Sequence, residues 1–70
     1  MTIYVVPNEQ ALMVAVGWLN ANEHRIKNRP DLYPNGFDFP TYFDMPNAMV
    51  ENLTSEDVDW LQEQTNGWIK

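Results

Sequence analysis

The sequence predicts a small α+β domain with four parts: a short N-terminal strand, a long first helix, an aromatic and proline-rich loop or edge strand, and a capped C-terminal helix packed on the first. Three observations support this fold: a β-branched and aromatic run at residues 2–6, helically spaced apolar residues from Leu12 onward, and a capping signature at residues 54–57. Seventy residues without a repeat or a linker-like stretch indicate a single domain over residues 1–70.

The first strand and the start of the first helix follow one another directly. Residues 2–6 are of the types enriched in strands, and Pro7 closes the run. Asn8 then suits a helix N-cap, because its side-chain oxygen accepts from the free amides of the first turn. Glu9 lies where the helix dipole favours an anion. We therefore expect a helix that begins directly after Asn8.

Helical spacing of apolar residues continues to Ile26, and further apolar residues widen the stripe over the first two turns. That first half of the helix is expected to be almost entirely buried. Residues 20–27 are polar and then basic, which suits exposure near the negative end of the dipole. Arg29 precedes a proline and predicts the helix end. The core residues expected from the two helices are Leu12, Val16, Leu19, Val58 and Leu61.

The middle of the chain, residues 30–44, contains three prolines and a Pro-Asn-Gly turn signal, and predicts an ordered loop or hairpin. Residues 37–43 fit a short strand. Pro40 confines that strand to a sheet edge or breaks it, because proline lacks an amide donor. Asp44 with the Met-Pro pair after it fits the cap and first turn of a short helix that extends to Asn52.

The last helix has the clearest local signature. Thr54 places a capping hydroxyl three residues before the Asp57 carboxylate, as in a capping box where aspartate replaces the usual glutamate or glutamine. Asn66 followed by glycine predicts the C-terminal stop. One helix face is expected to carry Val58, Leu61, Thr65 and Trp68, with Trp60 beside it.

Charge divides the chain into two halves. The formal net charge is −6, and residues 30–69 hold eight acids and no base. Such a surface is repelled by phosphates and anionic membranes and attracted to basic proteins. We therefore expect a larger protein with a basic surface as the partner, and no direct binding to nucleic acid or membrane. The three bases of residues 25–29 are expected to form salt bridges to the acidic half or to cap the first helix.

The residue types that carry catalysis and metal binding are scarce. The chain has no cysteine, its only serine is Ser55 in the helix cap, and its only histidine, His24, has no partner at metal-binding spacing. The glycines are isolated, so no phosphate-binding loop is expected. We predict a protein that is not an enzyme and holds neither a metal nor a cofactor.

The longest nearly unbroken apolar run, residues 11–19, is less than half of the roughly 20 residues that span a bilayer. No basic region precedes it, as a secretory signal would require. We therefore expect a cytoplasmic protein. Since a small domain without disulfides often hides apolar surface by self-association, a homo-oligomer stays open.

Two groups of residues indicate binding. Five aromatic residues lie between Tyr33 and Phe43, where they either anchor an interface or complete a core. Glu56, Asp59 and Glu63 recur at helical spacing, so their carboxylates line one face, either for a basic partner or for solubility alone. The partner-binding candidates are Asp38, Asp44, Glu51, Glu56, Asp59, Glu63, Tyr33, Phe37 and Tyr42.

The main functional hypothesis is a small acidic protein that binds a larger protein through this acidic and aromatic surface and modulates or inhibits it. A specific form is a DNA mimic acting on a nucleic-acid-binding protein, of the viral or plasmid counter-defence type. The alternative is a structural or assembly subunit that uses the aromatic segment in a self-interface or a fixed complex. The main hypothesis requires the acids from Asp31 onward to form one contiguous patch.

Overall fold

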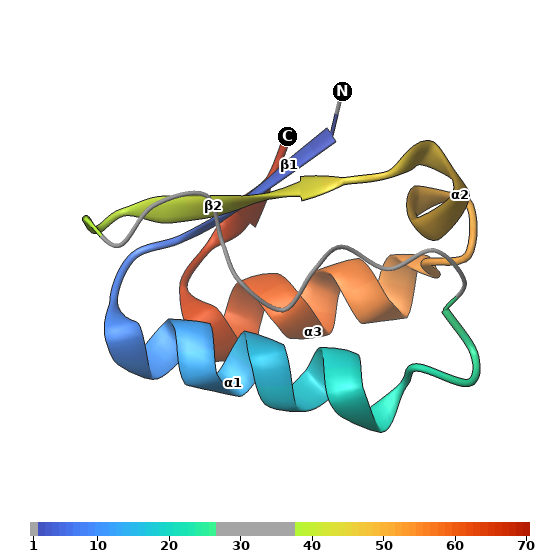
Figure 1. The fold of residues 1–70 in the computed structure, drawn as a ribbon, viewed down its shortest axis with the longest axis horizontal. Helices are drawn as coiled ribbons and strands as arrows, with labels where there is room; N and C mark the ends of the chain where they lie inside the picture. Colours follow the sequence, from blue (N-terminus) through green and yellow to red (C-terminus); the bar gives the residue numbers. More distant parts are fainter. Residues whose placement is uncertain (1, 27–37) are drawn as a thin grey trace.

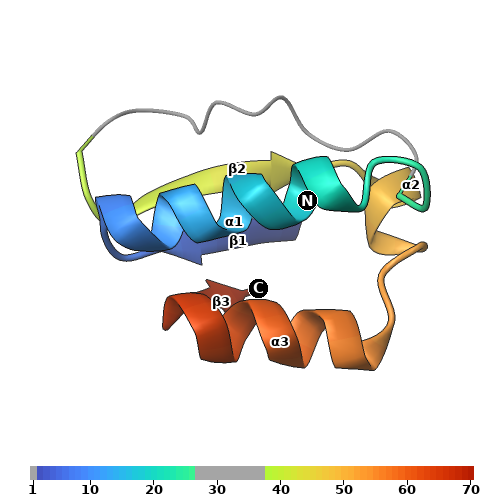
Figure 2. The same ribbon diagram turned by 90° about the horizontal axis from the view of Figure 1, so that it is seen from below.

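The computed structural model describes residues 2–26 and 38–70. The elements follow in the order β1 (Thr2–Val6), α1 (Glu9–Ala21), β2 (Thr41–Met45), α2 (Asn47–Val50), α3 (Ser55–Thr65) and β3 (Trp68–Ile69). They form two layers: the sheet covers α1 and α3, which lie side by side and antiparallel on one of its faces (Figures 1 and 2). The predicted α+β class is confirmed, as is the packing of the last helix on the first.

Among the described residues, β1 is the central strand of a three-stranded antiparallel sheet with the order β2-β1-β3. Val5 of β1 lies opposite Tyr42 of β2 on one side and Trp68 of β3 on the other. Pro40 directly precedes β2, so this proline starts the strand and takes no ladder donor away from it. The predicted edge strand is therefore present, displaced toward the C-terminus.

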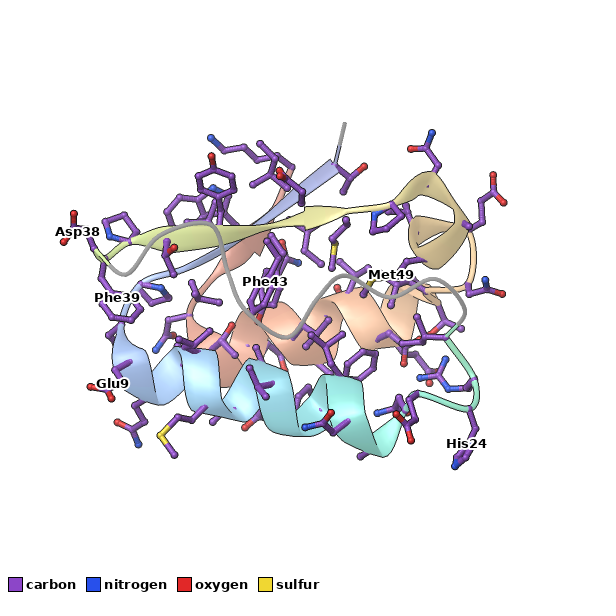
Figure 3. All side chains as sticks on the ribbon, viewed as in Figure 1. Glu9, His24, Asp38, Phe39, Phe43 and Met49 are labelled. Atoms are coloured by element: carbon purple, nitrogen blue, oxygen red, sulfur yellow. The ribbon has the colours of Figure 1, made fainter. Side chains whose placement is uncertain are left out.

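The core lies between the sheet and the helices. The rings of Tyr4 and Phe43 stack with their centroids 5.9 Å apart, and Phe43 and Met49 point into the space between the layers (Figure 3). Of the expected core residues, Leu19 and Leu61 are buried, whereas Leu12, Val16 and Val58 are only half-buried. The buried hydrophobic residues are Tyr4, Val6, Ala11, Ala15, Leu19, Ile26, Phe43, Met45, Met49 and Leu61.

A buried hydroxyl pair connects the sheet to α3. The Tyr4 hydroxyl lies 2.7 Å from Oγ1 of Thr65, and the Thr65 hydroxyl donates in turn to the carbonyl oxygen of Leu61. Burial raises the pKa of the Tyr4 phenol above its ordinary value, against the lowering effect of the hydrogen bond with Thr65. Because a buried polar atom without a partner costs ~1–3 kcal/mol, these mutual bonds allow two polar side chains within the core.

Helix α1 is shorter than the sequence predicts. It ends at Ala21, and the carbonyl oxygen of Trp18 accepts both the last helical hydrogen bond, from the backbone amide of Asn22, and a bond from the Asn22 side-chain amide at 2.8 Å. The amides of Arg25 and Ile26 then donate to the carbonyl of Asn22 and form a turn. The expected continuation of the helix is therefore wrong for residues 22–26, while residues 27–29 lie outside the described residues.

The first half of α1 is also less buried than expected. Met13 is 69% exposed and Val14 36%, although both belong to the apolar run. The helix meets the core along Ala11, Ala15 and Leu19, which are spaced by one turn. A helix that covers one face of a sheet buries one stripe, and the apolar residues outside that stripe stay in solvent.

The local signals for caps are confirmed. Asn8 Oδ1 accepts from the amide of Ala11 at 2.8 Å at the start of α1. In the capping box of α3, Thr54 Oγ1 accepts from the amide of Asp57 at 3.1 Å, and the Asp57 carboxylate accepts from the amide of Thr54 at 3.0 Å. Asn66 ends α3 with a left-handed φ of 55°.

Asp44 does not cap a helix, and Trp68 does not lie on one. Asp44 lies in β2 and is the pairing partner of Ile3 in β1. Helix α2 begins after Pro46 without a side-chain cap and ends at Val50, short of the predicted Asn52. Trp68 belongs to β3, since the turn after α3 returns the chain along β1. This turn requires Gly67, where an added Cβ would lie 2.1 Å from the carbonyl oxygen of Val5. Asp44 and Trp68 are therefore strand residues because both pair with β1.

Candidate functional site

The acidic candidates of the last helix form a ridge on its outward side. At 100° per residue, Glu56, Asp59 and Glu63 lie within about 60° of one another on α3, roughly opposite the buried Leu61. All three are exposed. We call these three residues the α3 ridge. The ridge points away from the sheet, because the opposite side of α3 carries Leu61, which is buried against the sheet.

An exposed tryptophan lies beside the ridge. Trp60 is 39% exposed, and it follows Glu56 by four residues and precedes Glu63 by three, so both carboxylates flank it along α3. Its ring stacks on Trp18 of α1 with the centroids 6.2 Å apart. The stacking holds the indole in place between the two helices, with one part of its surface left in solvent.

Arg25 connects the turn that follows α1 to helix α3. Its guanidinium donates two hydrogen bonds to the Asp57 carboxylate, at 2.8 and 3.1 Å, and one to Asn22 Oδ1 at 3.1 Å. It also lies over the Trp18 ring, 5.7 Å from the centroid. Partial burial raises the pKa of Asp57, but the hydrogen bonds from Arg25 and Thr54 outweigh it and bring the pKa below its ordinary value. The expected salt bridge from a basic residue to the acidic half is therefore present at Arg25.

A second surface is the outer face of the sheet, turned away from the helices. Along each strand the residues alternate, so Phe43 faces the core while Tyr42 and Asp44 point outward. Trp68 shares this outward side, being opposite Val5 and 43% exposed. We call this surface the outer sheet face; its residues are Ile3, Val5, Tyr42, Asp44, Trp68 and Lys70.

The acidic candidates do not form one patch. Asp44 lies on the outer sheet face, whereas the α3 ridge lies on the opposite side of the two-layer fold. Asp38 is exposed at the far end of the sheet, ahead of β2 (Figure 3), and Glu51 is exposed at the end of α2. The expectation of a contiguous acidic surface is therefore wrong, because two layers send the acids of β2 and of α3 in opposite directions.

The aromatic candidates are also divided. Tyr42 is 40% exposed on the outer sheet face, while its neighbour Phe43 belongs to the core. Tyr33 and Phe37 lie outside the described residues. The reading of this segment as core is therefore right for Phe43, and Tyr42 is available to an interface.

Sequence reasoning missed two exposed tryptophans. Trp60 could have been found from the helical wheel, which places it between Glu56 and Glu63. Trp68 carried a strand signal, because an aromatic and a β-branched residue follow Gly67, where the helix has already stopped. Its outward direction depends on pairing with β1, which no local pattern contains.

One end of the groove between α1 and α3 is hollowed. A depression of about 170 Å³ is lined there by side-chain amides, hydroxyl and alkyl groups. It offers hydrogen bonds but neither an acid nor a base. Within residues 2–26 and 38–70, no three acids, histidines or cysteines come together as a metal site. The lining residues are Asn8, Gln10, Ala11, Val14, Gln64, Thr65 and Asn66.

Comparison with protein-family models, with curated proteins and with solved structures finds no match for this chain. Across the part of the chain that the structure describes, no helix has both the length and the apolar character needed to cross a membrane.

Proposed function

We propose that this protein is a small, non-enzymatic binding protein that modulates or inhibits a larger protein carrying a basic surface. Because the acids do not form one contiguous patch, this proposal is narrower than the hypothesis drawn from the sequence: the contact is formed by the α3 ridge together with Trp60 alone. One observation carries the proposal: three exposed carboxylates stand on one side of α3 beside an exposed tryptophan, with no basic side chain among them on that helix. The proposal places this activity in the cytoplasm.

Repulsion between the carboxylates of the α3 ridge lowers the stability of the helix, and a binding function would explain why the acids are nevertheless present. Like charges one helical turn apart repel by a few tenths of a kcal/mol per pair. A lysine or arginine on this side of α3 would remove the repulsion, yet α3 contains none. A basic partner would relieve the repulsion on binding, and its attraction to the ridge would speed the encounter.

Trp60 would supply binding affinity that the charges of the α3 ridge alone do not provide. Long-range attraction steers and orients a partner, whereas affinity comes mainly from a few well-packed anchors, among which tryptophan is enriched. Stacking on Trp18 limits the motion of the Trp60 ring before binding, so little conformational entropy remains to be lost. An aromatic anchor framed by carboxylates suits a basic site that also has an apolar pocket.

The DNA-mimic form of the proposal rests on the spacing of the ridge. Along α3 the three acids rise by about 4.5 and 6 Å, which makes a short row of negative charges on a rigid support. A phosphate backbone offers a similar row of negative charges to a nucleic-acid-binding protein. In this form the partner is a protein that binds DNA, and the ridge occupies its DNA site.

The test compares two variants with the same change of charge. The ridge variant carries Glu56→Lys, Asp59→Lys and Glu63→Lys. The control variant reverses the other acidic candidates, with Asp38→Lys, Asp44→Lys and Glu51→Lys. Each protein is immobilised and exposed to cell extract at low and at moderate salt, and the retained proteins are identified and quantified.

The wild type and the control variant should retain the same partner, strongly at low salt and weakly at moderate salt. The ridge variant should lose it. Trp60→Ala in the wild-type background should weaken capture about tenfold or more without changing the salt dependence. Release of the partner by duplex DNA would support the mimic form. Equal capture by the ridge variant and the wild type would refute the proposal.

The alternative, a structural or assembly subunit, is favoured by a different observation. Tyr42 and Trp68 are exposed on the outer sheet face, which carries only one acid and one base among its residues. A subunit of this kind would bind through that face, and its association would respond little to salt. In the capture test the control variant, which alters Asp44, would then be the one that fails.

A further inference from the structure

The outer sheet face exposes an aromatic side chain on each edge strand, with the half-buried Val5 of the central strand between them. Tyr42, Val5 and Trp68 form one row across the sheet, since Val5 is the pairing partner of both aromatic residues. Tyr42 and Trp68 are 40% and 43% exposed. The helices lie on the other side of the sheet (Figure 1). A row of two aromatic rings around a valine is the kind of surface that a second layer normally covers.

A second row gives this face opposite charges at its two rims. Ile3 is paired with Asp44, and the amide of Lys70 donates to the carbonyl of Ile3 at 2.8 Å, which continues the β3 ladder by one residue. Strand alternation then points Asp44, Ile3 and Lys70 outward together. The face therefore has an acid at its β2 rim, a base at its β3 rim and apolar groups between them.

This arrangement is self-complementary about one twofold axis. If two copies meet face to face about an axis parallel to β1, then β1 lies over β1 and β2 lies over β3 of the other copy. Asp44 then faces Lys70 and Tyr42 faces Trp68, and each pairing occurs twice. A twofold axis perpendicular to the strands brings Asp44 over Tyr42 instead and pairs no opposite charges.

We propose that the outer sheet face binds a second copy of this chain about a twofold axis parallel to β1. Asp44 also has an interaction within its own chain. A carboxylate has about four acceptor positions, and the proposal requires one of them for the lysine of a second copy. The two α3 ridges then point away from each other, on the two outer sides of the dimer. The inference is therefore independent of the function proposed for the α3 ridge, and it names a second copy as the occupant of the face on which the alternative function rests.

The size of the face sets the strength of this association. Three strands about 4.8 Å apart and five residues at about 3.4 Å each make a face roughly 15 Å on a side. That is well below the ~800 Å² per partner of a standard stable interface. The dimer should therefore be weak, with a dissociation constant on the order of hundreds of micromolar.

Sedimentation equilibrium over about 20 µM to 2 mM measures this constant for four proteins. They are the wild type, Asp44→Lys, Lys70→Glu and the double swap Asp44→Lys with Lys70→Glu. Each single reversal places like charges opposite one another at two positions, so dimerisation should weaken about tenfold. The double swap restores opposite charges and should return the constant to within about threefold of the wild type. Far-UV circular dichroism checks that all four fold alike.

Amide NMR spectra recorded over the same concentrations locate the contact. Signals of β1, β2 and β3 should shift as the dimer forms, while those of the α3 ridge stay in place. A wild type that is monomeric at 2 mM would overturn the proposal, as would single and double variants that weaken the dimer equally. Shifts concentrated on α1 and α3 would mean self-association through the helices and would also refute it.

Discussion

The two outer sides of this protein both expose aromatic side chains, and they differ in charge. Trp60 on the helix side is 39% exposed, and Tyr42 and Trp68 on the sheet side are 40% and 43% exposed. Among the described residues, the outer sheet face carries one acid and one base at its rims, whereas the α3 ridge carries three acids. Aromatic exposure therefore does not distinguish the two surfaces. Charge does, and on this difference we base the two proposals, a basic partner for the α3 ridge and a second copy for the outer sheet face.

The difference follows from the periods of the two kinds of structure. A helical repeat of 3.6 residues brings acids three and four positions apart onto one line, and so concentrates Glu56, Asp59 and Glu63. A strand repeat of two residues separates neighbours onto opposite faces, and pairing with β1 then places Asp44 and Lys70 on either side of Ile3. The same composition thus yields a concentrated charge on one side and a balanced one on the other.

The largest expected effect is a difference in stability between two neighbouring residues of β2, one in the core and one on the outer sheet face. Phe43→Ala removes a buried ring that stacks on Tyr4 and should cost about 3–5 kcal/mol, most of the stability of a domain this small. Tyr42→Ala, one residue away, should cost less than about 1 kcal/mol, because the side chain is 40% exposed. Urea denaturation measures both. Similar losses in free energy would mean that the outer sheet face belongs to the core.

An effect of intermediate size is the difference in stability expected between variants of two acids on α3, Asp57, which is bonded to Arg25, and Asp59, which is exposed on the α3 ridge. Asp57→Asn removes the negative charge that pairs with Arg25 and one of the two oxygens that accept from Arg25 and Thr54, and should cost about 1 kcal/mol of unfolding free energy. Asp59→Asn, the same chemical change on the α3 ridge, should cost nothing or give a slight gain. If Asp59→Asn were as damaging as Asp57→Asn, the ridge would be part of the structural framework and not a free surface.

The same pair of variants has a pH signature. The pKa of Asp57 is below its ordinary value of 3.8 in the folded protein, so its stabilisation is present above that value and is lost as pH falls through the folded pKa. The stability gap between the wild type and Asp57→Asn should be full above about pH 5 and close at pH values well below 3.8. Chemical denaturation at several pH values measures it. A gap that persists at the lowest pH would contradict an ionic origin.

The smallest expected effect tests the repulsion within the ridge. The neutral variant Glu56→Gln, Asp59→Asn, Glu63→Gln should be more stable than the wild type by a few tenths of a kcal/mol at low salt. The difference should shrink as salt screens the carboxylates. Thermal unfolding at two salt concentrations measures it. A neutral variant that is less stable than the wild type would mean that the acids make favourable contacts, and the cost attributed to the ridge would be wrong.

The sequence by itself determined the features that depend on neighbours along the chain. The first strand was predictable from its residue types, which are those enriched in strands. The Asn8 cap, the Thr54–Asp57 capping box and the stop at Asn66 were predictable, because each depends on bonds within about four residues. The alignment of Glu56, Asp59 and Glu63 on one side of a helix was predictable for the same reason. So was the α+β class, since strand and helix periods are visible in the spacing of apolar residues.

Tertiary structure alone decided which of these features share a surface. Pairing with β1 made Asp44 and Trp68 strand residues on an outward face, although we predicted a helix cap for Asp44 and a helix face for Trp68. The single stripe that α1 buries left Met13 and Val14 in solvent. Two layers then separated acids that the sequence presents as one run. The physical reason is that hydrogen bonds between strands and burial between layers join residues far apart in the chain, and no local pattern records those partners.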